Sequence, residues 1–221
     1  MDQLLLLAAT ILLVLANAFF VASEFAIVKI RPTRLEQLVR EGDGRAKRAL
    51  QMTQKLDSYL SANQLGITLA SIALGWIGEP AIANLIRPSM HRHGFTESTS
   101  HAVALTISFV VITALHTIIG ELAPKSLAIQ RTERVTLLTA KPLHIFYLVM
   151  WPFIWSLNGA ANAFIRLFGL HPAKGEELQH TSEELRMLLT PPVSGLDLEL
   201  RRMIVRVFDF RRRTARHVMS L

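Results

Sequence analysis

The 221-residue sequence contains no cysteine, which excludes disulfide bonds and thiolate metal sites. Charged side chains are also scarce, at 19% of the residues, whereas a typical soluble domain has about 25%. Hydrophobic residues make up 51% of the chain, and the mean hydropathy is +0.34. This composition is not that of an ordinary soluble domain, and it predicts a membrane protein.

Acidic residues are the scarcer of the two charged classes. The 17 Asp and Glu residues are outnumbered by 24 Lys and Arg residues, which gives a formal net charge of +7. Nucleic-acid binding is not expected, because the sequence has neither interleaved aromatic and basic residues nor a DNA-binding motif. In a membrane protein, excess Lys and Arg mark segments that face the anionic cytoplasmic leaflet. We therefore expect membrane lipids as partners, and no nucleic acid.

The apolar segments also lack the residue sets of intramembrane enzymes. They hold no zinc-binding pair of His and Glu, no dyad of Ser and Lys, and no paired aspartates. We therefore expect that the chain is not an enzyme.

Apolar stretches long enough to cross a membrane are the dominant pattern. The three clearest are at about residues 3–30, 59–78 and 101–123. The first has no basic residue at its amino end and is too long for a signal peptide. Lys29, Arg31 and Arg34 follow it, and the positive-inside rule places that end in the cytoplasm. The expected protein is multi-pass in the cell (inner or plasma) membrane, with its N-terminus outside and its C-terminus cytoplasmic.

The segment after the first span is strongly basic. Eight Lys or Arg residues occur from Lys29 to Lys55, and residues 41–44 (EGDG) form a turn signal between two apolar-periodic stretches. This pattern predicts a cytoplasmic helical hairpin against the membrane surface. The second span is followed by a predicted loop at about residues 79–100.

A fourth apolar stretch, about residues 135–168, contains Pro142, Pro152 and the pair Asn158 and Gly159. Basic residues flank it on both sides, and a single crossing cannot have both ends in the cytoplasm. We therefore predict a kinked juxtamembrane belt helix. The expected fold is an all-α membrane protein with three transmembrane helices, the hairpin and this belt. Residues 1–170 form the membrane domain, and residues 171–221 form a cytoplasmic helical linker.

Polar residues near the cytoplasmic ends of the three spans form a candidate cation site. They are Ser23 with Glu24, Asn63 with Gln64, and Gly120 with Glu121. Hydroxyl, amide, backbone carbonyl and carboxylate oxygens suit Mg²⁺, Ca²⁺ or Na⁺ rather than softer metals. An intramembrane carboxylate costs roughly 2.5–3.5 kcal/mol, and either a bound cation or protonation would offset this cost. The alternative is that these residues, like Ser71, serve helix packing and interhelical hydrogen bonds.

Glu121 has two interpretations from the sequence. Pro124 lacks an N–H and so frees one helical carbonyl, which favours a cation site beside the carboxylate. The alternative is an i,i+4 ion pair of Glu121 with Lys125 at the membrane interface.

Histidines offer weaker signals. His116 lies within the third span, where packing against a neighbouring helix and a proton-relay role both stay open. His91 and His93 lie after the second span without a carboxylate pattern, which is typical of solvated residues rather than a metal site.

Three ordered motifs resemble a known family. They are residues 17–26 (NAFFVASEFA), 63–70 (NQLGITLA) and 120–125 (GELAPK). Together they resemble the DUF21 transmembrane domain of the CorC/CNNM family, over essentially the whole chain. Residues 208–210 (FDF) and the segment after them are similar to that family's linker into a pair of CBS domains, which is absent from this sequence.

The resemblance implies a homodimeric Mg²⁺ transporter or exporter coupled to Na⁺, with an inward-facing site for dehydrated Mg²⁺. ATP would bind only at the absent CBS domains. The implied ligands are side-chain oxygens of Ser23 and Asn63, the carbonyl of Gly120 and the carboxylate of Glu121. The implied supporting residues are Glu24, Gln64, Pro124 and Lys125. One departure is Val21, where many relatives have serine. The alternative function is a membrane-anchored regulator or sensor of Mg²⁺ homeostasis that does not itself transport.

Overall fold

The computed structural model describes residues 3–92, 96–169 and 203, and every element in these ranges is a helix. In chain order the helices are α1 (Gln3–Lys29), α2 (Pro32–Arg40), α3 (Gly44–Thr53), α4 (Leu56–Arg92), α5 (Glu97–Leu115), the π-helix η1 (His116–Leu122), α6 (Ala123–Gln130) and α7 (Thr132–Leu167). The predicted all-α class is confirmed. The predicted linker at residues 171–221, Met203 excepted, and the side chains of His91 and His93 lie outside the described part of the chain.

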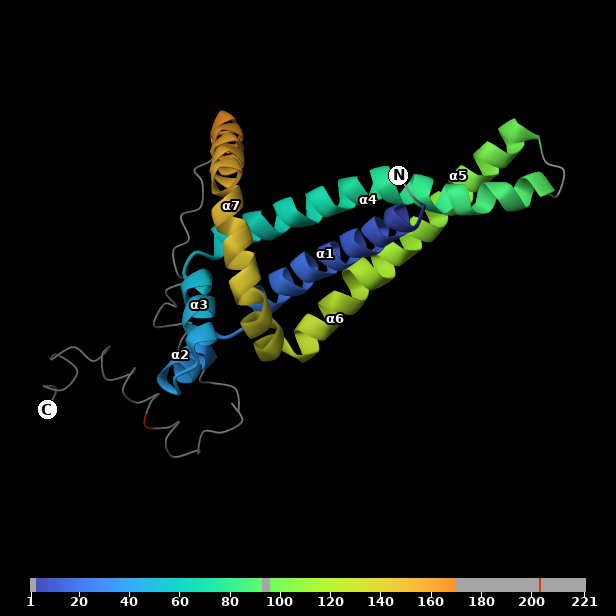
Figure 1. The fold of residues 1–221 in the computed structure, drawn as a ribbon. Helices are drawn as coiled ribbons and strands as arrows, with labels where there is room; N and C mark the ends of the chain where they lie inside the picture. Colours follow the sequence, from blue (N-terminus) through green and yellow to red (C-terminus); the bar gives the residue numbers. More distant parts are fainter. Residues whose placement is uncertain (1–2, 93–95, 170–202, 204–221) are drawn as a thin grey trace, which may run out of the picture. The chain divides into compact units, whose positions relative to one another are not determined.

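Helix α1 packs against both α4 and the continuous rod formed by α5, η1 and α6 (Figure 1). It runs antiparallel to α4: Gln3 Nε2 donates to the Ala81 carbonyl at 2.7 Å, and Phe20 lies against Gly66. It runs parallel to the rod. Asn17, in the middle of α1, contacts Gly120, and Lys29, at the C-terminal end of α1, donates through Nζ to the carbonyl of Ile129 at 3.0 Å, near the C-terminal end of α6. Together, α1, α4 and the rod of α5, η1 and α6 contain the interior polar groups discussed below.

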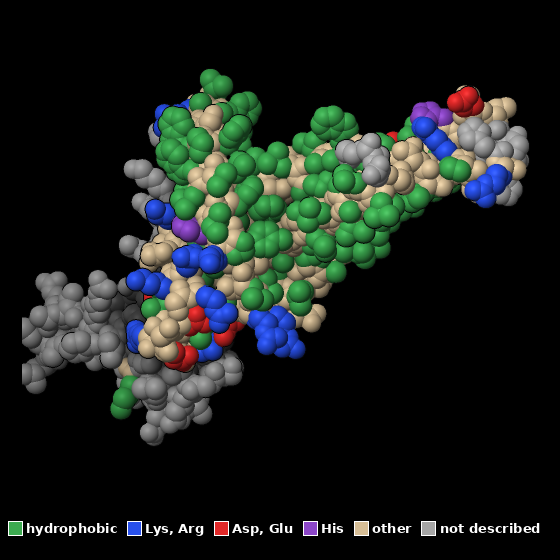
Figure 2. All heavy atoms as spheres, viewed as in Figure 1, with side chains coloured by type: hydrophobic (Ala, Val, Ile, Leu, Met, Phe, Trp, Pro, Cys, Tyr) green, Lys and Arg blue, Asp and Glu red, His purple; other side chains and the backbone are tan. Residues whose placement is uncertain are grey.

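The outer surface of this bundle is apolar and its interior is partly polar. Trp76 is 82% exposed and Leu4 80%, whereas Asn17 and Asn63 are completely buried. Figure 2 shows hydrophobic side chains along the shaft, with Lys and Arg gathered over α2 and α3. Four helical segments are long and apolar enough to cross a membrane, namely Gln3–Lys29, Leu56–Met90, Glu97–Gln130 and Thr132–Leu167. The chain is therefore a multi-pass membrane protein.

Helix α4 corrects the predicted loop after residue 78, because it continues through Pro80 and Pro88 to Arg92. Membrane helices tolerate proline where neighbouring helices support the backbone. Here Ala81 and Ala83 are buried against the bundle, which holds the helix together beyond Pro80. The second and third long helices consequently extend well past the predicted spans.

Helices α2 and α3 form the predicted hairpin around residues 41–44. Gly42 has a φ of 92°, a left-handed conformation that favours glycine. Asp43 then caps α3 by accepting from the Arg45 N–H at 2.8 Å, and these hydrogen bonds hold the pKa of the Asp43 carboxyl below its ordinary value. Arg34 Nε donates to Glu133 at 2.8 Å, which attaches α2 to the start of α7.

Helix α7 is continuous despite Pro142 and Pro152, and its axis crosses those of α1 and α4 in Figure 1. Tyr59 Oη and His144 Nδ1 are 2.7 Å apart, and Ser61 Oγ donates to Asn158 Oδ1 at 3.0 Å. These contacts hold α7 against the first turns of α4. The belt assignment stays a prediction, because α7 is also long and apolar enough to cross a membrane.

Single cysteines at the exposed residues Arg134 and Arg166 test whether α7 is a belt. A belt helix predicts that a membrane-impermeant thiol reagent labels both Arg134→Cys and Arg166→Cys from the same side of sealed vesicles. The background is clean, because the chain has no cysteine. Labelling of the two positions from opposite sides would show that α7 crosses the membrane.

The contact between Gly66 and Phe20 gives a stability prediction. A Cβ at Gly66 would lie 2.6 Å from the Phe20 ring, so Gly66→Ala should cost about 1–3 kcal/mol through overpacking. Gly159→Ala is the matched control, because nothing lies within 4 Å of its added Cβ and helix propensity favours alanine by roughly 0.5–1 kcal/mol. Thermal unfolding in detergent should show a lower Tm for the first variant alone. Equal or higher stability of Gly66→Ala would refute this packing.

Candidate cation site

Ser23 on α1 and Asn63 on α4 are buried polar residues at the same level of the bundle. The antiparallel contacts of Phe20 with Gly66 place Ser23 level with Asn63. Ser23 is 1% exposed and Asn63 is 0% exposed. Within the described residues, Ser23 Oγ and both polar atoms of the Asn63 side chain have no hydrogen-bond partner. We call these two residues the orphan pair.

Such an arrangement is costly unless something binds to it. A buried polar group without a partner costs about 1–3 kcal/mol. The hydrocarbon chains of the lipid cannot offset this cost, because they form no hydrogen bonds. A hydroxyl oxygen and an amide oxygen at one level are suitable ligands for a hard cation. The orphan pair is therefore the strongest structural indication of a ligand in the described part of the chain.

Gly120 lies in the π-helix η1, four residues before Pro124. In a regular α-helix the N–H of residue 124 would donate to the Gly120 carbonyl, but proline has none. The backbone widens instead, so that the Ala123 N–H donates to the Ile118 carbonyl. The Gly120 carbonyl accepts from Asn17 Nδ2 at 3.0 Å. A Cβ at Gly120 would lie 3.1 Å from that nitrogen, so the close approach of α1 depends on glycine.

Asn17 belongs to a hydrogen-bonded chain that connects all three rods. Ser71 Oγ donates to Asn17 Oδ1 at 3.4 Å, and it lies 3.2 Å from His116 Nε2. We call Asn17, Ser71 and His116 the Asn17 cluster. The sequence assigned Ser71 to packing and left His116 open, and it did not single out Asn17. An amide within an uncharged apolar run was the available signal.

Glu121 lies near His116 and makes no ion pair with Lys125. Its Oε1 lies 3.9 Å from His116 Nε2, and its side chain is 46% exposed. A π-helix brings residues i and i+5 into register, which explains this neighbour. Lys125 Nζ stands 4.6 Å from the centroid of the Phe25 ring, a cation–π contact. The ion pair of Glu121 with Lys125 is not formed between these two described residues.

The predicted ligands lie at two levels of the bundle. Gly120 is level with Asn17, and Ser23 follows Asn17 by six residues, which is about 9 Å along a helix. No hydrogen bond or ion pair in residues 3–92 or 96–169 joins the orphan pair to Gly120 or Glu121. Of the supporting residues, Pro124 is buried, Glu24 is half-buried and Gln64 is exposed.

The ligand atoms available in the site restrict which ions it could bind. The described residues contain no group of three or more His, Asp or Glu side chains that could hold a metal. Any ion here must be held mainly by neutral oxygens with at most one or two carboxylates, which suits Mg²⁺, Ca²⁺ or Na⁺.

Comparisons with known proteins show the family of the chain. A family model described as the Cyclin M transmembrane N-terminal domain, CNNM, matches residues 8–194. The chain is 46% identical over 220 residues to UPF0053 protein YhdT of Bacillus subtilis, covering 99% of this chain and 47% of that protein. It is 45% identical to UPF0053 protein YrkA of the same organism, covering 94% of this chain and 48% of that protein.

A more distant relative extends the comparison. The uncharacterized protein Rv1841c of Mycobacterium tuberculosis is 34% identical over 215 residues, covering 96% of this chain and 61% of its own length. The chain thus spans about half the length of the Bacillus relatives that it matches.

Replacement of Asn17 tests the hydrogen bond to Gly120. Asn17→Leu keeps the side-chain volume but leaves the Gly120 carbonyl without its donor, so we expect a loss of about 1–2 kcal/mol. Asn162→Leu, at an exposed position of α7, is the matched control and should change stability by less than about 0.5 kcal/mol. Thermal unfolding in detergent measures both. Indistinguishable melting temperatures for the two variants would contradict a structural role for Asn17.

Proposed function

The chain belongs to the CNNM family, a family of membrane domains related to the transport of Mg²⁺ and other metal ions or to its regulation, and on that premise we propose that it transports Mg²⁺. The observation that carries the proposal is the orphan pair: two buried oxygen-bearing side chains without partners, level with each other on α1 and α4. Mg²⁺ takes oxygen ligands and retains several waters, so a few protein oxygens suffice.

In the proposed site Ser23 Oγ and Asn63 Oδ1 bind the ion directly. The Gly120 carbonyl and the Glu121 carboxylate supply the remaining protein ligands, and Glu121 supplies negative charge. Because Gly120 is bonded to Asn17 at a different level, we propose that η1 shifts toward the orphan pair when the ion binds. Pro124 makes this shift possible, since η1 lacks one backbone hydrogen bond there. In this scheme Glu24, Gln64 and Lys125 support the site without contacting the ion.

Charge distribution supports an inward-facing site. The orphan pair lies near the end of the bundle that leads into the basic hairpin of α2 and α3, and excess Lys and Arg favour the cytoplasmic side. This orientation places the N-terminus outside and makes export the proposed direction, with Na⁺ as the coupling ion. Homodimer formation and ATP binding by further CBS domains belong to the same proposal.

A regulatory role is the second candidate function. The hairpin, α7 and the start of α4 are joined by the ion pair of Arg34 with Glu133 and by the contact of Tyr59 with His144. These links would carry a signal between cytoplasmic segments and the membrane helices. A sensor would bind Mg²⁺ in the same place but would not move it.

Mg²⁺-induced stabilisation tests the binding site. At 100 times the Kd, bound Mg²⁺ should stabilise the chain by about 2.7 kcal/mol. This gain should disappear in Asn63→Leu and fall in Glu121→Gln. Asn84→Leu on the exposed face of α4 and Glu97→Gln at the start of α5 are the matched controls and should keep it. Equal Mg²⁺ stabilisation in Asn63→Leu and Asn84→Leu would reject the site.

Flux measurements separate transporter from sensor. Proteoliposomes loaded with a Mg²⁺ indicator should show movement of Mg²⁺ that depends on an imposed Na⁺ gradient and is lost in Asn63→Leu. Mg²⁺-induced stabilisation without flux under any gradient would favour the sensor.

A further inference from the structure

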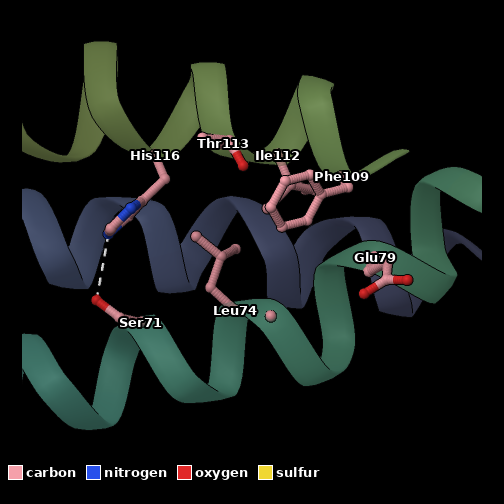
Figure 3. A pocket seen from close by; sticks show the side chains of 8 residues that line it. Ser71, Leu74, Glu79, Phe109, Ile112, Thr113 and His116 are labelled. Carbon is pink, nitrogen blue, oxygen red and sulfur yellow. Dashed lines mark hydrogen bonds between the residues drawn. The ribbon is translucent and has the colours of Figure 1, made fainter. Parts of the chain in front are cut away.

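A cavity of about 220 Å³ lies between α4 and the rod of α5 and η1 and opens to the outer surface of the bundle beside the exposed residues Phe109 and Thr113 (Figure 3). Its two ends are polar and its middle is apolar. Ser71 and His116 close one end with the 3.2 Å contact described above, and the Glu79 carboxylate lies at the other end. Leu74 and Ile112 form part of the wall between them. The cavity is large enough to hold several water molecules.

The cavity lies on the opposite side of the Asn17 cluster from the orphan pair. Because α1 and α4 are antiparallel, α4 residues beyond Ser71 face α1 residues before Asn17; Gly78, for instance, lies against Thr10. Along the bundle the order is therefore the orphan pair, the Asn17 cluster, the cavity and finally Glu79. The interhelical hydrogen bonds of the Asn17 cluster thus lie between the orphan pair and the cavity.

We propose that this cavity is a second, hydrated cation compartment on the Mg²⁺ path, and that the Asn17 cluster is the closed gate between it and the orphan pair. The proposal rests on the transport function proposed above. Glu79 supplies the charge that attracts a hydrated cation, and the apolar wall offers it few ligands, so the ion can leave again.

The geometry of the cluster suits a gate. Ser71 bridges α1 and η1 by two hydrogen bonds, and the longer of these, 3.4 Å, is weak. Breaking both contacts separates α4 from η1, and the Gly120 carbonyl is then held only by Asn17. A shift of η1 toward the orphan pair would break the contact of His116 with Ser71, so ion binding and opening of the gate would be linked.

Thiol accessibility tests the gate without requiring transport. Thr113→Cys reports on the cavity and Ser23→Cys reports on the orphan pair. In sealed vesicles, a cationic methanethiosulfonate reagent should reach Thr113→Cys from the non-cytoplasmic side and Ser23→Cys only from the cytoplasmic side. Adding Ser71→Ala or His116→Leu should raise the reactivity of Ser23→Cys from the non-cytoplasmic side at least about tenfold. Ser126→Ala, at an exposed serine of α6, should leave it unchanged.

The role of Glu79 has its own readout. The cationic reagent should modify Thr113→Cys several-fold faster than an anionic analogue does, because a nearby carboxylate concentrates cations. Glu79→Gln should abolish this preference and lower Mg²⁺ flux several-fold, while Mg²⁺-induced stabilisation at the orphan pair stays unchanged.

Several results would overturn the proposal. The first is that Thr113→Cys does not react with the reagent. The second is that the reagent already reaches Ser23→Cys from the non-cytoplasmic side. The third is that neither Ser71→Ala nor His116→Leu changes the reactivity of Ser23→Cys although both variants still unfold cooperatively. Absence of Mg²⁺ flux and of Mg²⁺ stabilisation in the unsubstituted chain would instead reject the transport function, and the labelling would still decide whether the gate exists.

Discussion

The hydrogen bond from Asn17 Nδ2 to the Gly120 carbonyl, at 3.0 Å, holds the polar interior of this bundle together. Polar groups inside a membrane must find partners within the protein. Pro124 removes the natural partner of Gly120, the backbone becomes a π-helix, and α1 supplies the missing donor through Asn17. The proximity of His116 to Glu121, five residues apart, follows from this widened turn.

The two polar levels near the middle and cytoplasmic part of α1 therefore differ in hydrogen bonding; Ser100 Oγ and Arg87 Nε, at the other end of the bundle, are also without a partner among the described residues. The Asn17 cluster is bonded through all three rods, whereas Ser23 and Asn63 are buried without partners. A membrane protein in which every polar group served packing would have both levels satisfied. The contrast between the two levels is the reason for assigning packing and gating to one and cation binding to the other.

The sequence predicts the class and much of the layout, but it does not predict the interior connections. Low charge and long apolar runs predicted the all-α membrane protein, and the turn at residues 41–44 predicted the hairpin. The helix beyond Pro80 was missed because burial of Ala81 and Ala83 outweighs a local breaker. A single depth for Ser23, Asn63 and Gly120 was expected from span positions alone. Helix register, which depends on packed pairs such as Phe20 with Gly66, separates them into two levels.

The most direct test of the central claim is to locate the ion. Crystals of the chain grown with Mn²⁺ in place of Mg²⁺ would show the metal by its anomalous scattering. The account predicts a peak between α1 and α4, with Ser23 Oγ and Asn63 Oδ1 each at about 2.1 Å, the distance that Mg²⁺ coordination requires. An ordered metal elsewhere in the bundle, with Ser23 and Asn63 still unliganded, would contradict it.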